Sequence, residues 1–178
     1  MARRLVTAVA ALLLVLGVVG PSFGAVDMFL SIPGYEGGCK EPGFEGWSTA
    51  YELQHQITNL SDLTRLPDET LTGEGDSLDL CLLKTIDKAS AKLSQACVVG
   101  TRLPVATIVH RIPVGGKVGY LTYEMHDVLV SRIVTVGPDH EGEESWLQSL
   151  PKGKGGQLLL LKPMKVQWSW GESHPTED

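Results

Sequence analysis

The chain has 178 residues and a formal net charge of -6, with 43% hydrophobic and 20% charged residues. This balance suits one globular domain with an apolar core and excludes an intrinsically disordered chain. The negative charge argues against nucleic acid or an anionic membrane surface as a partner. Three cysteines are too few for a disulfide-dense miniprotein, and without paired CxxC motifs they offer no structural zinc site.

Residues 1–24 have the layout of a secretory signal peptide. Arg3 and Arg4 precede an uncharged apolar run at residues 5–19, and Ser22 and Gly24 fit a cleavage site before Ala25. The run is short for a membrane span, which needs about 20 residues. We therefore predict a cleaved leader at residues 1–24 and a secreted domain at residues 25–178, in the periplasm or outside the cell and free of the membrane. An uncleaved membrane anchor is the alternative.

Alternating or β-branched residues predict strands over most of the remaining chain. In residues 26–32 the apolar side chains alternate with polar ones and share one face of the strand. In residues 47–57 one face is predicted to be buried and the other exposed to water. The residues of the buried face are Trp47, Thr49, Tyr51, Leu53 and Ile57. Residues 59–77, rich in Asp, Thr, Gly and Glu, predict a long exposed loop. Gly115 and Gly116 mark a hairpin between two strands. The seven predicted strands lie at residues 26–32, 47–57, 78–86, 105–112, 118–125, 128–136 and 158–170.

One short helix interrupts the strands at residues 87–100. The apolar residues Ala89, Leu93, Ala96 and Cys97 recur at helical spacing, Asp87 or Ser90 can cap the first turn, and Gly100 supplies a left-handed stop. The chain has no alternation of strands and helices of the kind that builds a parallel sheet. Seven strands and one helix therefore predict an antiparallel sandwich or barrel.

No residue pattern predicts catalysis, a cofactor or a metal site. The histidines are scattered singly, and His126 and Asp127, as strand neighbours, should point to opposite faces. His140 stands beside an acidic run, Glu141, Glu143 and Glu144, which is typical of a solvated loop; a divalent-cation site is the alternative. Trp146, Trp168 and Trp170 are expected to be core or subunit-contact aromatics.

The cysteines leave two interpretations open. Burial of Cys81 and Cys97 as small hydrophobic residues is the simpler one. In an oxidising compartment a Cys81–Cys97 disulfide is the alternative, and Cys39 would then be the odd thiol.

The helix segment resembles the signature of the haemolysin-coregulated protein (Hcp) family, the tube subunit of type VI secretion systems. Further similarity runs in order through residues 26–170, including the Asp127–Ser131 segment. The resemblance implies a two-sheet β-barrel with one flanking helix, in hexameric rings that stack into a tube, carry effector proteins and meet a spike protein. The motif residues are Asp87, Lys88, Ala89, Ser90, Leu93, Ala96, Cys97 and Gly100.

Two features depart from that family. Its tube subunits lack a signal peptide, and Pro163 stands where the family has an apolar strand residue, so the last strand should be bulged or lie at an edge. We expect a non-enzymatic protein that self-assembles and contacts other proteins. The alternatives are a monomeric exported binding module that uses the 59–77 loop and a hydrolase that uses His126, Asp127 or the acidic run.

Overall fold

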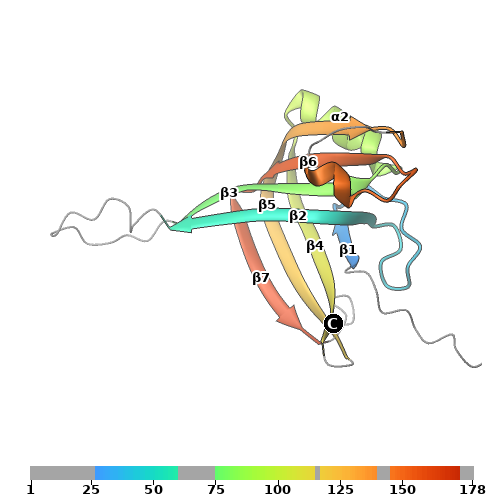
Figure 1. The fold of residues 1–178 in the computed structure, drawn as a ribbon. Coiled ribbons are helices and arrows are strands. Elements are labelled where there is room, and N and C mark those ends of the chain that lie inside the picture. The colour runs from blue at the N-terminus through green and yellow to red at the C-terminus, as the bar shows by residue number, and fades with distance from the viewer. Residues whose placement is uncertain (1–26, 60–74, 115–116, 140–144, 173–178) are drawn as a thin grey trace, which may run out of the picture.

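The computed structural model describes residues 27–59, 75–114, 117–139 and 145–172. These residues form seven strands, one α-helix and one 3-10 helix (Figure 1). In chain order they are β1 (Asp27–Ser31), β2 (Ser48–Asn59), β3 (Gly75–Thr85), α2 (Ala89–Val99), β4 (Arg102–Val114), β5 (Lys117–Val136), η2 (Ser145–Ser149), β6 (Gly156–Lys162) and β7 (Lys165–Gly171).

Six of the strands close into an antiparallel barrel. The order in the sheet is β4-β1-β2-β3-β6-β5, and β5 pairs back with β4 to complete the ring, while β7 is added to β5. The two predicted sheets are therefore opposite walls of one continuous sheet. The expected antiparallel β-barrel with one flanking helix is confirmed.

The number of strands matches the prediction, but two boundaries differ. The two strands predicted at residues 118–125 and 128–136 form one strand, Lys117–Val136. Asp127 has a left-handed φ of 50° between them, and the strand continues beyond it. The predicted strand at residues 158–170 is divided at Pro163, which has no N–H to donate to the sheet. Both halves still pair with β5, through Leu129↔Lys162 in β6 and His126↔Lys165 in β7.

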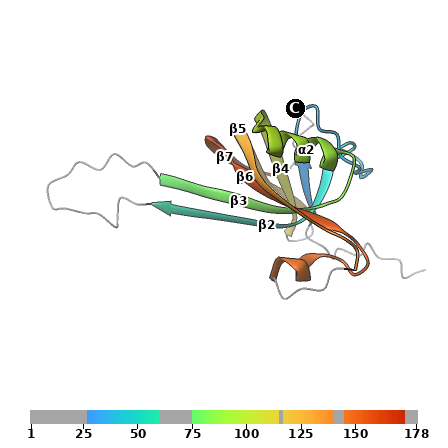
Figure 2. The same cartoon turned by 90° about the horizontal axis from the view of Figure 1, so that it is seen from above.

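The barrel wall splits at this same point. β3 pairs with β6 only from Leu80↔Leu161 to Thr85↔Gly156. Beyond Leu80 the β2–β3 pair leaves the barrel as a two-stranded arm, whereas β7 follows β5 in another direction (Figures 1 and 2). An ion pair of 3.2 Å between Lys162 and Asp79 spans the place where the strands separate.

The main core fills the barrel and continues under the helix. Its buried residues include Met28, Leu30 and Ile32 of the first strand segment, as the alternation predicted. The prediction that one face of β2 holds both Tyr51 and Leu53 was wrong before the β-bulge between Ala50 and Glu52, where Ala50 is in the main core and Tyr51 packs outside it. After the bulge Leu53 packs against the main core, as predicted. The other members of this core are Ala50, Leu80, Leu82, Ala89, Leu93, Leu103, Ala106, Ile108, Met125, Val128, Val130, Leu159 and Leu161.

Two smaller apolar clusters lie outside the barrel wall. The loop after β1 places Phe44 against Phe29, with ring centroids 3.9 Å apart. The 3-10 helix η2, which the sequence analysis missed, packs Leu147 against Leu83, and Leu150, which follows the helix, joins the same cluster. No helix of the described residues is long and apolar enough to cross a membrane.

Most of the predicted 59–77 loop and the Gly115–Gly116 turn lie outside the described residues. The antiparallel pairing of Val114 with Lys117 nevertheless confirms the hairpin that the two glycines predicted.

Candidate functional site

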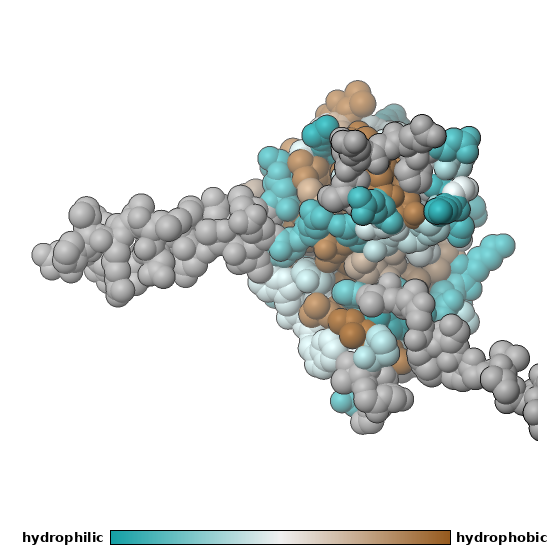
Figure 3. Space-filling view, viewed as in Figure 1, coloured by the Kyte–Doolittle hydropathy of each residue, from teal (hydrophilic) through white to brown (hydrophobic). Residues whose placement is uncertain are grey.

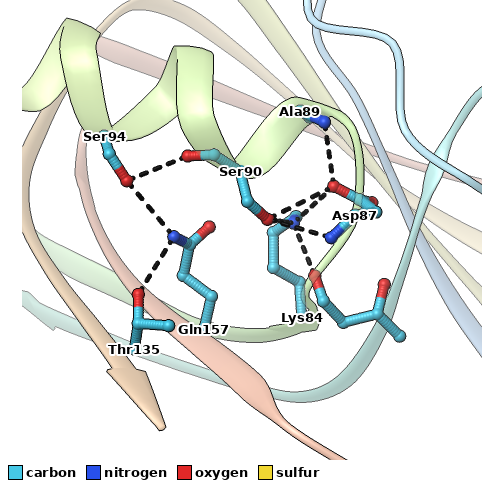
Figure 4. Close-up of polar contacts among 8 residues, drawn as sticks. Lys84, Asp87, Ala89, Ser90, Ser94, Thr135 and Gln157 are labelled. Carbon is cyan, nitrogen blue, oxygen red and sulfur yellow. Dashed lines mark hydrogen bonds and ion pairs between the residues drawn. The ribbon is translucent and has the colours of Figure 1, made fainter. Parts of the chain in front are cut away.

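A buried lysine organises the contact between the helix and the barrel. Lys84 faces inward on β3 and is fully buried. Its Nζ donates to the backbone oxygen of Thr85 at 2.6 Å, to Oδ1 of Asp87 at 2.9 Å and to Oγ of Ser90 at 3.1 Å (Figure 4). All three ammonium protons thus have an acceptor. Burial lowers the pKa of Lys84, and the hydrogen bond and charge of Asp87 oppose that shift.

The same carboxylate begins the helix. Oδ1 of Asp87 accepts a hydrogen bond from the N–H of Ala89 at 3.0 Å, and the N–H of Asp87 donates to Oγ of Ser90 at 3.0 Å. This reciprocal arrangement resembles a capping box, and both predicted cap residues take part in it. The start of helix α2 is therefore fixed to the barrel through Lys84.

Gln157 continues these polar contacts from the helix to β5. It lies opposite Lys84 in the β3–β6 pairing and is buried. Its Nε2 contacts Oγ of Ser94 at 3.4 Å and Oγ1 of Thr135 at 3.2 Å, so it joins the helix to β5 (Figure 4). We refer to Lys84, Asp87, Ser90, Ser94, Thr135 and Gln157 as the polar layer.

The remaining motif residues of the helix have packing roles. Ala89 and Leu93 are buried in the main core, Ala96 is buried as well, and Cys97 packs against that core. Gly100 ends the helix with a φ of 73° and donates to the backbone oxygen of Cys97 at 3.3 Å. Lys88 is exposed.

At the open end of the barrel, inner-face side chains continue outward onto β7. Two rows cross the strands: Leu30, Ile108, Tyr123 and Trp168 form one, and Met28, His110, Leu121 and Trp170 form the other. The last residue of each row is far more exposed than the first: 47% at Trp168 against 2% at Leu30, and 55% at Trp170 against 5% at Met28.

The outer part of these rows forms a partly exposed apolar surface. His55 of β2 lies against it, stacked on Trp168 at 5.9 Å between ring centroids and edge-on to Tyr123 at 6.0 Å. The ring of Trp170 covers Gly119, where an added Cβ would lie 2.4 Å from the indole. In Figure 3 the surface below the arm, over β7, is pale, with hydrophobic residues beside it. We call Leu121, Tyr123, Trp168, Trp170 and His55 the aromatic shelf.

The structure directs His126 and Asp127 to different partners. Nε2 of His126 lies 2.9 Å from Oε1 of Glu124 and 3.2 Å from Oε1 of Gln167. Asp127 instead accepts a hydrogen bond from Nη1 of Arg102 at 3.1 Å. The geometry does not pair them as a general base and its orienting acid, in agreement with the expectation from strand neighbours.

The other candidates for chemistry give no assembled site in the described part of the chain. No group of three metal-ligating side chains occurs within residues 27–59, 75–114, 117–139 and 145–172. The acidic run at residues 141–144 and His140 lie outside those ranges.

The cysteines are free thiols in the structure. Leu80 and Leu82, which flank Cys81 on β3, face the main core, whereas Cys81 lines a small outer pocket with Leu83 and Trp146. Cys97 packs on the core side. The Cys81–Cys97 bridge that the sequence allowed is not formed, because the two side chains lie on opposite sides of the wall. Burial and the charge of Asp79 raise the pKa of Cys81, which favours the unreactive thiol.

Comparison with known proteins identifies the family. A family model described as the type VI secretion system effector Hcp matches residues 29–154, which is more than half of the chain. The chain belongs to the Hcp family. None of the curated proteins compared with it matches.

Solved Hcp structures share the fold at low identity. A type six secretion system protein is 19% identical, with a TM-score of 0.65, over 81% of this chain and 83% of its own. Hcp1 from Salmonella typhimurium is 18% identical, with a TM-score of 0.57, over 84% of this chain and 95% of its own. The secreted protein Hcp3 from Pseudomonas aeruginosa is 14% identical, with a TM-score of 0.58, over 84% of this chain and 98% of its own.

Sequence reasoning missed the polar layer and the aromatic shelf as units. The available signal for the first was Lys84 itself, since it occupies an inward position in the period-two pattern of Leu80 and Leu82. Predicting the aromatic shelf would have required knowing that β5 pairs with β7, which the sequence pattern does not record.

Proposed function

We propose that this Hcp family protein is a structural subunit that self-assembles head to tail into hexameric rings and acts through protein contacts without catalytic turnover. In this proposal residues 1–24 direct export, and the protein works in the periplasm or outside the cell. Its partners are copies of itself, with effector proteins and a spike protein as further partners of the assembled ring. Family membership supports this role, and the divergent partners of His126 and Asp127 disfavour a hydrolase.

The observation that carries the proposal is the pair of strand edges created by the split in the barrel. Among the described residues, β7 pairs only with β5, and the Gly75–Ser77 end of β3 pairs only with β2. β3 and β6 pair as antiparallel neighbours up to Leu80, and β7 follows β6 along the same side of β5. The free edge of β7 and the free end of β3 are therefore the two sides of the split in the wall. Two different, complementary edges on one molecule suit a heterologous contact, which closes into a ring when the rotation allows it.

Exposed apolar side chains support contacts on another part of the surface. Val98 and Val99, near the end of the helix, are 87% and 71% exposed. They lie on the helix that covers one end of the barrel (Figure 1). Such residues suit contacts between stacked rings.

Electron microscopy of residues 25–178 with an edge variant tests the proposal. Gln167→Lys adds a charge to the exposed β7 edge, where lysine opposes strand pairing. Gln148→Lys makes the same change at an exposed position on η2 and serves as the control. Wild type and the control should form sixfold rings, and Gln167→Lys should form few. Single particles at every concentration in the wild type would contradict the ring and favour the monomeric binding module.

A further inference from the structure

A small pocket opens on the outer face of the barrel wall, where η2 packs against β2, β3 and β6. Its volume is about 110 Å³. A cavity of about 150 Å³ can hold a benzene molecule, so this pocket has room for a smaller group, such as an alkyl chain of about four carbons. The residues that line it are Glu52, Gln54, Cys81, Leu83, Leu158 and Trp146.

One carboxylate of the pocket is held in place by two neutral donors. Oε1 of Glu52 accepts a hydrogen bond from Nε2 of Gln54 at 2.6 Å, and Oε2 accepts one from Oγ of Ser149. Within the part of the chain that the structure describes, no lysine, arginine or histidine forms an ion pair with Glu52. A half-buried carboxylate that is oriented but has no countercharge favours a bound cation.

The other walls of the pocket suit the alkyl part of such a cation. Leu83 and Leu158 are paired across β3 and β6, and both belong to the outer apolar cluster with Trp146. An indole also attracts a cation through its π face. An anion would be repelled by Glu52, and a neutral apolar ligand would leave that carboxylate without a countercharge. The chemistry of the pocket therefore selects for an ammonium group carried on an apolar chain.

We infer that this pocket binds a primary ammonium on an alkyl chain of about four carbons. The ammonium donates to the carboxylate of Glu52, and the chain packs against Leu158 and the indole of Trp146. A lysine side chain of another protein and a free alkylamine both carry this group. The site lies outside the strand edges and the helix end used in the proposed assembly, and binding there depends on neither ring formation nor export.

Fluorescence titration of the full chain with butylammonium chloride tests the site. Binding should change the tryptophan emission, and Trp146→Phe should remove that change, which assigns the signal to the pocket. The neutral analogue 1-butanol has the same alkyl chain and should bind about tenfold more weakly, because it cannot form a charge-assisted contact with Glu52. Sodium chloride keeps the ionic strength constant.

A charge variant and a matched control identify the carboxylate. Glu52→Gln keeps the size of the side chain and should raise the dissociation constant for butylammonium about tenfold. Glu36→Gln removes the same charge at an exposed position outside the pocket and should leave the dissociation constant unchanged. Far-ultraviolet circular dichroism checks that both variants are folded. Equal affinity of wild type for butylammonium and 1-butanol would overturn the inference, as would equal affinity of wild type and Glu52→Gln.

A second probe distinguishes the two sources of the ammonium. Nα-acetyl-lysine amide carries the same group on a peptide-like backbone. If it binds as tightly as butylammonium and loses affinity in Glu52→Gln, the pocket accepts a lysine side chain presented by a protein. If butylammonium alone binds, the pocket takes a free alkylamine. Both results support the site, whereas failure of both probes to bind at any concentration would overturn it.

Discussion

The ammonium of Lys84 lies 2.9 Å from the carboxylate of Asp87, and the side chains of the two are 0% and 6% exposed. This ion pair joins the end of β3 to the start of α2. A charge buried so deeply is tolerated only with its partners in place, because desolvation costs several kcal/mol per ion. The contact therefore makes the docking of the helix dependent on a few polar atoms.

Asp87→Asn should destabilise the protein by about 3 kcal/mol, because it keeps a capping oxygen but leaves Lys84 charged and buried without a countercharge. Urea unfolding followed by circular dichroism measures the loss. Lys84→Met combined with Asp87→Asn should lose less than Asp87→Asn alone. Lys88→Met, at the neighbouring exposed lysine, should stay within about 0.5 kcal/mol of the wild type. A double variant less stable than the single one would contradict the role given to the buried charge.

A second prediction concerns Gly100, the residue that ends helix α2. Gly100→Ala should cost about 1 kcal/mol, because Gly100 has a φ of 73°, where an added Cβ is strained. Gly137→Ala is the matched control, since its added Cβ meets no atom within 4 Å and its φ lies outside the left-handed region. The midpoints of urea unfolding give the comparison. Equal stability of the two variants would show that the stop contributes nothing.

The fold was predictable where local signals were strong. The helix and its glycine stop followed from residues 87–100, and Asp87 and Ser90 act at its start as expected. The strand alternation of residues 26–32 placed Met28 and Leu30 correctly in the core. These features depend on neighbours along the chain, which a sequence pattern records.

Predictions failed where a single residue changed the strand geometry or where tertiary pairing decided the outcome. Asp127 keeps β5 continuous with a left-handed φ, and Arg102 binds its side chain and backbone oxygen. The bulge at Ala50/Glu52 reversed the faces of β2. The predicted third strand ran to Ile86, but the strand ends at Thr85 and Ile86 is 48% exposed.

Acid should weaken the fold through His110. Its ring lies between Met28 and Leu121 in the inner row, and burial lowers its pKa from 6.5. Below about pH 6.5 the unfolded chain binds the proton more readily than the folded one, so stability falls as the pH drops through this window. His110→Leu should lose less stability than wild type between pH 7.5 and 5. An unchanged loss, measured by urea unfolding at both pH values, would exclude His110 as a cause.

The thiols can be counted directly. The structure has Cys39, Cys81 and Cys97 free, so alkylation with iodoacetamide in denaturant, without a reducing agent, should add three labels to a protein of residues 25–178. Intact mass spectrometry reads the number. One label, with the other two thiols recovered after reduction, would show that a disulfide forms despite the placement of Cys81 and Cys97 on opposite sides of the wall.

The most direct test of the central claim is the absolute mass of residues 25–178 in solution, measured by light scattering after gel filtration over a range of concentration and salt. The account predicts a species of six times the mass of one chain. A mass of one chain under all conditions would contradict it, and would mean that the barrel of the Hcp family is retained here without the ring.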